Sequence, residues 1–434
     1  MGSSLTAPFS SAPVGSTVRQ AAHTFVVRGL TFSCRAALVV ILAKLLRPDD
    51  YGAYALVTTI TTFGIVLAGL SLHTYVFRAV PGRPPEEQLQ IFKATSIFEF
   101  LSTLALVVFV AASGLLGVAL TALRASEHAS AFTVGLLLLL LLVPLAEASH
   151  FLLAQSRVEQ ANWVDFFSQA AWVLPLGALA MLRIPIGLRG ILLTQLGGCV
   201  IALVYAAVQI GPSAWWRARP DWRVLRGGLA YSIPMVIPPL ALYSLKLADR
   251  FFLSHYHTLQ QVGIYSFAYT LVNTAYTFTA WIAFTTMGPR IIRAHNNGSY
   301  RERDVLQTYT VKVALVSFIG AVVVMLLLAD PLVRFAARPE YLAARQPLPL
   351  LSVAYVFMIL TFPAQYALMM DKRMVVMVTI DLIGMAVGIA LDFWLIPIWS
   401  YNGAAVASAI GFAVVLIGKY SCSSALTFRE FARP

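Results

Sequence analysis

Two pairs of basic side chains lie inside long apolar runs or close to their ends. Arg28 and Arg35 are seven residues apart, and Lys246 and Arg250 are four apart, so each pair shares one face of a helix. A charge at membrane depth costs about 2.5 to 3.5 kcal/mol on insertion scales, so it marks a binding or transport path, snorkels to an interface or has a partner. Because guanidinium groups grip phosphate oxygens bidentately, the four cations predict a site for a diphosphate.

Acidic residues in apolar segments form a second group. Asp249 lies between two of the cations, and Asp381 and Asp392 are eleven apart, close to three turns, on one predicted helix. Glu147 and His150 are three apart on another helix and are expected to form a satisfied polar pair. These groups could couple transport to Na⁺ or H⁺, or they could neutralise a neighbouring cation. No cofactor, metal cluster, nucleophile triad or nucleotide-binding motif is visible.

The composition excludes a soluble protein. Of the 434 residues, 59% are hydrophobic and 12% are charged, and the mean hydropathy is +0.78, whereas soluble domains carry about 25% charged residues. Runs such as Leu101 to Leu123 are long enough to cross a bilayer, and backbone groups in lipid must pair internally. The predicted class is an all-α integral membrane protein. The net charge of +12 is dispersed among short loops, which favours contact with anionic lipid and requires no nucleic acid.

The apolar runs predict about twelve transmembrane helices in two groups of six. The predicted ranges are 24–45, 53–77, 94–120, 131–154, 163–182, 190–210, 227–248, 261–287, 308–329, 345–370, 374–398 and 402–421. Basic loop residues are twice as frequent on the side that holds both chain ends, so we expect both termini in the cytoplasm.

The chain divides into five predicted segments. They are a disordered tail (1–21), an N-terminal lobe (22–210), a basic linker (211–226), a C-terminal lobe (227–421) and a second tail (422–434). Sliding the chain by 211 positions places Gly52 on Gly263 and Arg35 on Lys246, as a repeat of two six-helix halves would. Pro234 and Pro238 predict a bend in the seventh helix, either a gate or a static kink.

Several motifs resemble the polysaccharide transporter family of Wzx-like oligosaccharide flippases, which shares a superfamily with MATE multidrug exporters and the lipid II flippase. They are LRPDDYGAYAL (46–56), YSIP (231–234), LADRFFL (247–253), QVGIYSFAYTLV (261–272) and LDFWLIPIWSYNGAAVASAIG (391–411). The resemblance covers nearly the whole chain. Two positions depart from the family, which usually has Asn in place of Asp392 and Gly in place of Ser400.

The resemblance implies a V-shaped, MATE-like bundle that works by alternating access in the bacterial cytoplasmic (inner) membrane. Its implied cargo is an undecaprenyl-diphosphate-linked oligosaccharide, such as a lipopolysaccharide O-antigen or exopolysaccharide repeat unit. Implied partners are membrane lipid, a glycan polymerase and glycosyltransferases. Two alternatives stay open. A multidrug antiporter of the same superfamily would be expected to have an acidic cavity, and a membrane glycan polymerase or ligase would be expected to carry a larger outer loop.

Overall fold

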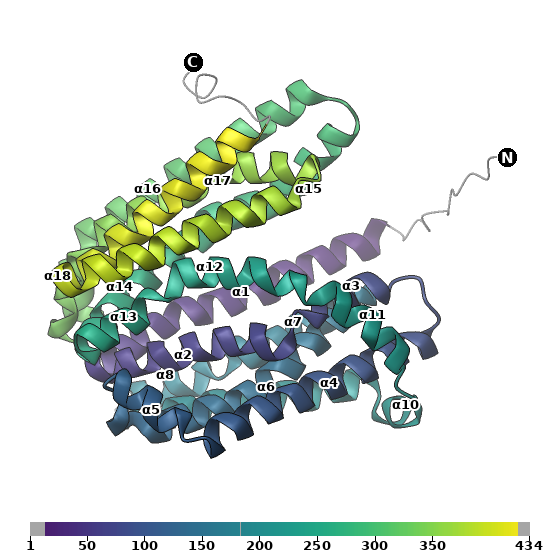
Figure 1. The fold of residues 1–434 in the computed structure, drawn as a ribbon, viewed down its shortest axis with the longest axis horizontal. Helices are drawn as coiled ribbons and strands as arrows, with labels where there is room; N and C mark the ends of the chain where they lie inside the picture. The colour runs from purple at the N-terminus through teal and green to yellow at the C-terminus, as the bar shows by residue number, and fades with distance from the viewer. Residues whose placement is uncertain (1–13, 183, 424–434) are drawn as a thin grey trace.

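The computed structural model describes residues 14–182 and 184–423, and within these ranges the chain forms helices and no β-strand (Figure 1). The elements of the first half, from α1 to α9, form one group of packed helices. They are α1 (Val14–Leu45), α2 (Pro48–Gly69), α3 (Leu72–Ala79), α4 (Pro85–Ala112), α5 (Leu115–Ala122), η1 (Ser126–His128), α6 (Ala129–Ala154), α7 (Val158–Phe166), the π-helix η2 (Phe167–Ala171), α8 (Val173–Met181) and α9 (Leu188–Ile210).

The remaining elements follow a short basic stretch. They are α10 (Pro212–Arg217), α11 (Trp222–Ser232), η3 (Pro234–Val236), α12 (Ile237–Leu247), α13 (Asp249–Tyr256), α14 (Leu259–Tyr276), the π-helix η4 (Thr277–Trp281), α15 (Ile282–Asn296), α16 (Tyr300–Ala336), η5 (Pro339–Arg345), α17 (Pro347–Met370) and α18 (Met374–Cys422). We call the part from α12 to α18 the second half.

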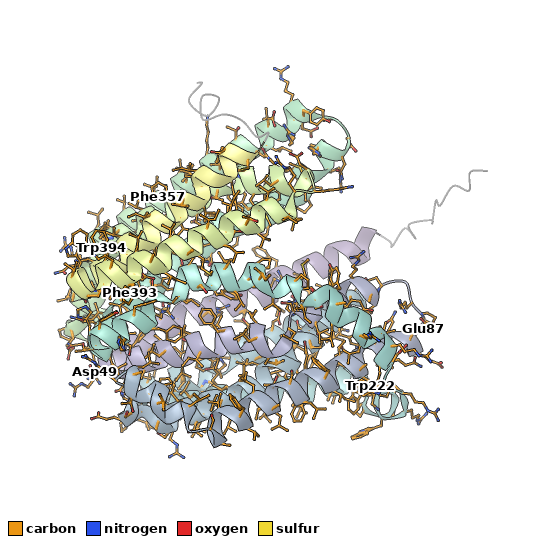
Figure 2. The ribbon with its side chains drawn as sticks, viewed as in Figure 1. Asp49, Glu87, Trp222, Phe357, Phe393 and Trp394 are labelled. Atoms are coloured by element: carbon orange, nitrogen blue, oxygen red, sulfur yellow. The ribbon has the colours of Figure 1, made fainter. Side chains whose placement is uncertain are left out.

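The surface of the bundle is apolar along its length and charged at its ends. Large hydrophobic side chains point outward, among them Leu327, which is 74% exposed, and Val375, which is 80% exposed. Asp49 and Glu87 lie at opposite ends of the first half in Figure 2. An apolar belt between charged ends is the surface that a bilayer requires, which confirms a multi-pass membrane protein.

Within residues 14–182 and 184–423, nine helices are long and apolar enough to cross a membrane, and the bent pair Trp222–Ser232 and Pro234–Leu247 makes a tenth. Helix α18 counts once in this number, although Ser400 (φ 52°, ψ −135°) breaks it into two arms. The run from Leu259 to Asn296 is also long enough, but polar and tyrosine side chains lower its hydropathy. With these two additions, the described part of the chain provides the twelve predicted crossings.

The two halves meet at one end and splay apart at the other (Figure 1). The sealed end is where α2 and α14 begin, and the splayed end is where α1 begins and α18 ends. Helix α11 departs from the predicted lobe boundary at residue 227. It packs against α3 and α4 of the first half through Leu225, Leu72 and Ala94. The chain joins the second half only after the break at Pro234.

The predicted repeat is visible in the helix boundaries. Helix α1 ends at Leu45 and α13 ends at Tyr256, while α2 begins at Pro48 and α14 begins at Leu259, so both pairs keep the 211-residue offset. Gly52 and Gly263, which the same offset relates, lie where α2 and α14 cross. A Cβ on Gly263 would come 1.9 Å from the Pro48 carbonyl oxygen. Only glycine permits this backbone approach between the halves.

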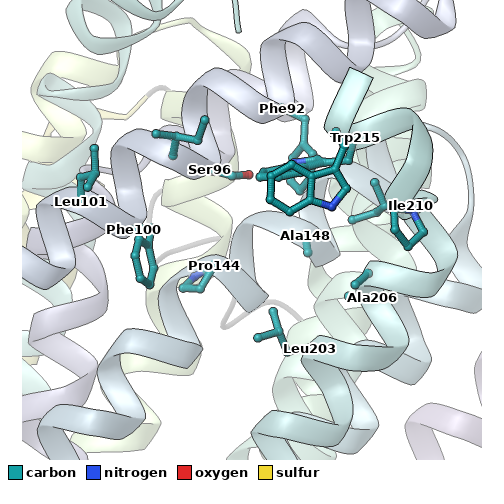
Figure 3. Close-up of a pocket in the computed structure, with 14 residues that line it drawn as sticks. Phe92, Ser96, Phe100, Leu101, Pro144, Ala148, Leu203, Ala206, Ile210 and Trp215 are labelled. Atoms are coloured by element: carbon teal, nitrogen blue, oxygen red, sulfur yellow. The ribbon is translucent and has the colours of Figure 1, made fainter. Parts of the chain in front are cut away.

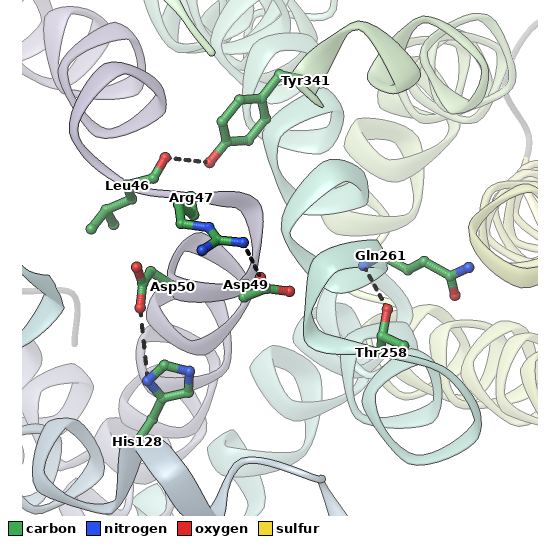
Figure 4. Close-up of polar contacts among 8 residues, drawn as sticks. All are labelled: Leu46, Arg47, Asp49, Asp50, His128, Thr258, Gln261 and Tyr341. Atoms are coloured by element: carbon green, nitrogen blue, oxygen red, sulfur yellow. Dashed lines mark hydrogen bonds and ion pairs between the residues drawn. The ribbon is translucent and has the colours of Figure 1, made fainter. Parts of the chain in front are cut away.

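Polar contacts between the halves close the sealed end (Figure 4). The Tyr341 hydroxyl in η5 donates to the Leu46 carbonyl at 3.3 Å. The Arg338 guanidinium donates to the Leu45 carbonyl at 3.2 Å. Burial raises the pKa of the Tyr341 phenol, so the hydroxyl stays protonated and remains a donor. These contacts satisfy carbonyls that the end of α1 leaves without helical partners.

One predicted boundary differs from the structure. Residues 14–21 were assigned to a tail but form the first turns of α1, and residues 1–13 lie outside the described part of the chain. Most of the predicted C-terminal tail (422–434) also lies outside it. Hydropathy locates the apolar part of a helix and misses the polar turns that extend beyond the membrane.

Candidate functional site

The two arginines of α1 are held by amide side chains of the fifth crossing. The Arg28 Nε donates to Asn162 Oδ1 at 3.1 Å, and Arg35 Nη1 donates to Gln169 Oε1 at 3.2 Å. Both arginines are solvent-exposed and stay seven residues apart along one face, as predicted. A guanidinium has five N–H donors, and each of these bonds occupies one. The pair is therefore oriented, and no further hydrogen bond to a described residue holds either guanidinium, although the Asp165 carboxylate of α7 interacts with both electrostatically. Donors remain for an anion.

Two π-helices flank this stretch of α1. Gln169 lies in η2, which packs on α1, and Phe278 lies in η4, whose ring meets Phe32 of α1 at a centroid distance of 4.6 Å. An inserted π-turn often marks a functional site because it shifts the helix face that side chains occupy. The arginine face of α1 thus lies beside elements of both halves.

Lys246 and Arg250 share a face of the seventh crossing, as predicted, and they lie over tyrosines of α14 and α17. The Lys246 ammonium lies 5.6 Å from the ring centroids of Tyr276 and Tyr355, and the Arg250 guanidinium lies 4.7 Å from that of Tyr269. Tyrosine faces attract cations and lower the cost of holding them at depth.

Arg250 departs from the predicted cationic path. It is buried, and its Nη1 donates to the Thr59 hydroxyl of α2 at 2.9 Å. In this conformation it joins the two halves and is closed to a ligand. The structure thus separates the four cations into two exposed arginines, one partly buried lysine and one interior arginine, because α13 packs directly on α2.

A carboxylate pair lies in the second half. Asp249 accepts hydrogen bonds from the hydroxyls of Tyr265 and Ser408, and Asp392 of α18 interacts with it electrostatically. Both aspartates are buried, and the Oδ1 atom of each has no hydrogen-bond partner among the described residues. Hydroxyl and carboxylate oxygens are ligands that suit a small hard cation or a shared proton.

The other predicted acidic groups have different surroundings. Asp381 pairs with Lys419 at 2.8 Å, so its charge is neutralised within the fold. Glu147 and His150 do not form the expected pair. The His150 ring contacts the Ala146 carbonyl of its own helix and the ring of His73 in α3, and no hydrogen bond joins it to Glu147 among the described residues. No group of three or more potential metal ligands occurs in the described ranges.

The predicted bend is present in the seventh crossing. Pro234 begins the 3₁₀ segment η3, Pro238 lies in the first turn of α12, and the flanking helices are bent by 46°. Before the bend the seventh crossing packs against the first half, and after the bend it packs against the second half. Whether it also moves stays a prediction.

An apolar groove of about 420 Å³ lies between helices of the first half and α10 (Figure 3). Its walls come from α4, α6, α9 and α10, and Phe100, Pro144 and Trp215 line it. Lys93 lies beside it, but its ammonium donates to three main-chain carbonyls, including that of Trp215. The groove offers room for an acyl chain and no free charge.

Sequence reasoning missed the partners of the cations. Asn162 and Gln169 are seven residues apart, the same spacing as Arg28 and Arg35, and that match was the available signal. It becomes meaningful only when α1 and the fifth crossing are known to pack in parallel. The tyrosines beside Lys246 gave no comparable signal.

Two family models match the chain. The model described as polysaccharide biosynthesis protein matches residues 18–295, and the MatE model matches residues 234–394. A comparison with curated protein sequences finds no match.

Solved structures share the fold. An inward-facing multidrug resistance MATE family transporter of the MOP superfamily matches with a TM-score of 0.73 at 14% identity, covering 92% of this chain and 96% of that one. The lipid II flippase MurJ in an inward closed conformation matches with a TM-score of 0.73 at 14% identity, covering 95% and 89%. An outward-facing MATE transporter gives 0.50 at 13% identity, covering 92% of both chains.

Proposed function

This chain belongs to the family of polysaccharide biosynthesis proteins, and from that membership we propose that it is a flippase for undecaprenyl-diphosphate-linked oligosaccharides. Its family and fold are those of transporters and not of enzymes. The cargo would be an O-antigen or exopolysaccharide repeat unit that moves from the inner to the outer leaflet of the bacterial cytoplasmic membrane. Both termini would lie in the cytoplasm, at the splayed end.

The observation that carries the choice of cargo is the arginine pair of α1. Arg28 and Arg35 are exposed, oriented by amides and provided with free N–H donors. A diphosphate that leaves the interfacial water needs such fixed cations, and Arg supplies them with a geometry that matches phosphate oxygens. Lys246 in its tyrosine surroundings would provide a further positive charge at depth.

Asp249 and Asp392 support a coupling role in the same proposal. Two buried carboxylates with unpaired oxygens would bind Na⁺ or H⁺ in one conformation and release it in the other. Asp381 is excluded from this role because Lys419 already neutralises it. Binding of the coupling ion would favour one arrangement of the halves. The cargo would then move down its own concentration gradient, or it would be drawn across the membrane by its consumption on the other side.

A drug and cation antiporter is the second candidate, because the MatE model matches part of the second half and MATE transporters share the fold. The sign of the exposed charge separates the two functions. A site for cationic drugs needs exposed carboxylates, whereas the exposed ionisable groups on the inner face of α1 are arginines.

Substitution of both arginines by Ala tests the cargo. The double variant Arg28→Ala, Arg35→Ala should export at least about tenfold less glycan and accumulate lipid-linked sugar on the inner leaflet, since each lost charged hydrogen bond is worth about 1.5 to 3 kcal/mol. Arg301→Ala, an exposed arginine at the start of α16, is the matched control and should export normally. Normal export by the double variant, at parental protein levels, would overturn the cationic-site proposal.

A further inference from the structure

Two glutamates meet inside the first half, away from both the arginines of α1 and the aspartates of the second half. Glu99 of α4 is 2% exposed and Glu147 of α6 is 0% exposed. The carboxylates interact electrostatically. A Cβ on Gly69, the last residue of α2, would lie 3.5 Å from Glu99 Oε1 and 3.6 Å from the Val143 side chain, one turn before Glu147. The pair therefore lies where α2, α4 and α6 converge.

Neither glutamate is neutralised by its surroundings. Glu99 Oε2 and both carboxylate oxygens of Glu147 lack a hydrogen bond of ordinary geometry among the described residues. The Thr95 hydroxyl interacts with Glu147, but it donates its hydrogen to main-chain carbonyls. Neither carboxylate has an ion-pair partner in the described part of the chain. Other acidic side chains inside the bundle have partners. Asp381 forms an ion pair with Lys419, and Asp165 accepts a hydrogen bond from Ser149. Two ionised carboxylates side by side without water or a cation would be strongly destabilising.

The oxygen atoms available as ligands around the two glutamates suit a proton better than a metal ion. The nearby hydroxyls of Thr95, Ser102 and Thr103 donate to main-chain carbonyls. A cation such as Na⁺ would need several converging oxygens, whereas a proton needs only the two carboxylates.

We propose that Glu99 and Glu147 form a proton-binding site in the first half, which holds at least one proton in this conformation and exchanges it when the halves rearrange. This site goes beyond the flippase function, because it depends on the buried pair and not on the identity of the cargo. It is also separate from the Asp249–Asp392 pair, which lies in the second half.

The chain geometry links the pair to the contact between α3 and α11. Directly after Gly69, Leu70 and Ser71 have φ values of 47° and 55°, so α2 breaks before α3 begins. The Ser71 hydroxyl donates to the Met235 carbonyl of η3 at 3.3 Å. Ionisation beneath this break would disturb the turn that leads into α3, and α3 packs on α11. Proton loss would therefore favour a different packing of the seventh crossing.

Other titratable groups on the packed elements have their own partners. His73 of α3 and His150 of α6 form a half-buried ring pair with centroids 4.5 Å apart, close to Asp165 of α7. They are the neighbouring groups through which protons could reach the pair. The remaining charges on α2, α3, α4, α9, α10 and α11 lie at helix ends or contact other groups, namely Asp49, Asp50, Arg78, Glu86, Glu87, Lys93, Arg189, Arg217, Arg223 and Arg226.

Infrared difference spectroscopy tests the site in lipid nanodiscs. A protonated carboxyl gives a C=O stretching band that shifts in D₂O and disappears as pH rises. The double variant Glu99→Gln, Glu147→Gln should lose such a band. Each single variant should shift the pH at which the band disappears by about one unit or more, because the remaining carboxyl no longer faces a second one.

The exposed Glu127→Gln variant is the matched control and should keep the parental spectrum. Gln preserves the shape of Glu, and if the double variant fails to fold, the two single variants still give the test. The proposal is overturned if every Gln variant keeps the parental band, or if Na⁺ added at constant pH removes the band in the parent. The cargo is absent from this experiment, so its failure would leave the flippase proposal standing.

Discussion

At the scale of single residues, position decides what an arginine can do. Arg28, Arg35 and Arg250 have the same side chain, but the first two are exposed with free donors and the third is buried between Thr59 and Tyr269. Removing Arg250 would leave Asp249 with less compensation in the interior. An effect of that substitution on transport would therefore report on folding as much as on cargo.

Asp392 offers the clearest test of ion coupling, because Asn has the same shape as Asp but carries no charge. Asp392→Asn should fold normally and lose the stimulation of transport by a Na⁺ or H⁺ gradient by about tenfold, about 1.4 kcal/mol, since one of two charges is removed. The measurement is flipping in proteoliposomes with and without each gradient. Glu86→Gln, an exposed residue of α4, should retain the stimulation. Full stimulation in Asp392→Asn would show that Asp249 and Asp392 do not couple transport to the ion gradient.

At the scale of elements, breaks in helices position the functional groups. The bend at Pro234 moves the seventh crossing from one half to the other, the π-helices flank α1, and Ser400 separates the two arms of α18. At Ser400 the chain has φ 52° and ψ −135°, a conformation that favours glycine.

Ser400→Gly should stabilise the protein. Relief of the backbone strain is worth about 1 to 3 kcal/mol, and it should exceed the loss of the hydrogen bond from Ser400 to Gln261, about 0.5 to 1.5 kcal/mol. Thermal unfolding in detergent should show a higher midpoint than the parent. Ser400→Ala, which loses the same bond and keeps the strain, should show a lower one. A lower midpoint for Ser400→Gly would mean that the hydrogen bond outweighs the strain.

At the scale of the whole molecule, the crossing of α2 and α14 holds the sealed end closed. Gly52 and Gly263 let the two backbones touch, and Tyr341 and Arg338 bond across the halves nearby. Alternating access requires this crossing to open when the splayed end closes. The equilibrium between the two arrangements should therefore depend on how closely the glycines approach.

Gly263→Ala should shift the population toward a conformation that is open at the sealed end, because its Cβ would overlap the Pro48 carbonyl oxygen. Spin labels at positions 127 and 340, which are exposed on opposite halves at this end, would report a longer distance. Cys422 would be replaced beforehand, while Cys34 and Cys199 are buried. Gly320→Ala has open space around it and should give the parental distance. A parental distance in Gly263→Ala would show that the crossing does not govern opening.

The sequence predicts the repeated architecture well, because apolar runs, loop charges and the 211-residue offset each report on it. The charged residues at depth are also evident from the sequence. Their partners are not, since the amides beside Arg28 and Arg35, and the contact of α11 with the first half, depend on how distant helices pack. For the same reason Glu147 was paired with His150, its neighbour in sequence, and not with Glu99, its neighbour in space.

The central claim is that this protein moves a lipid-linked sugar and not a cationic drug. The most direct measurement places undecaprenyl-diphosphate-linked oligosaccharide in the leaflet of proteoliposomes that faces the splayed end, and follows its appearance in the opposite leaflet with a membrane-impermeant sugar-modifying enzyme. The account predicts rapid appearance with the parent, at least about tenfold slower appearance with Arg28→Ala, Arg35→Ala, and no transport of a lipophilic cationic dye. Gradient-driven movement of the dye, with the lipid-linked sugar left in its original leaflet, would contradict it.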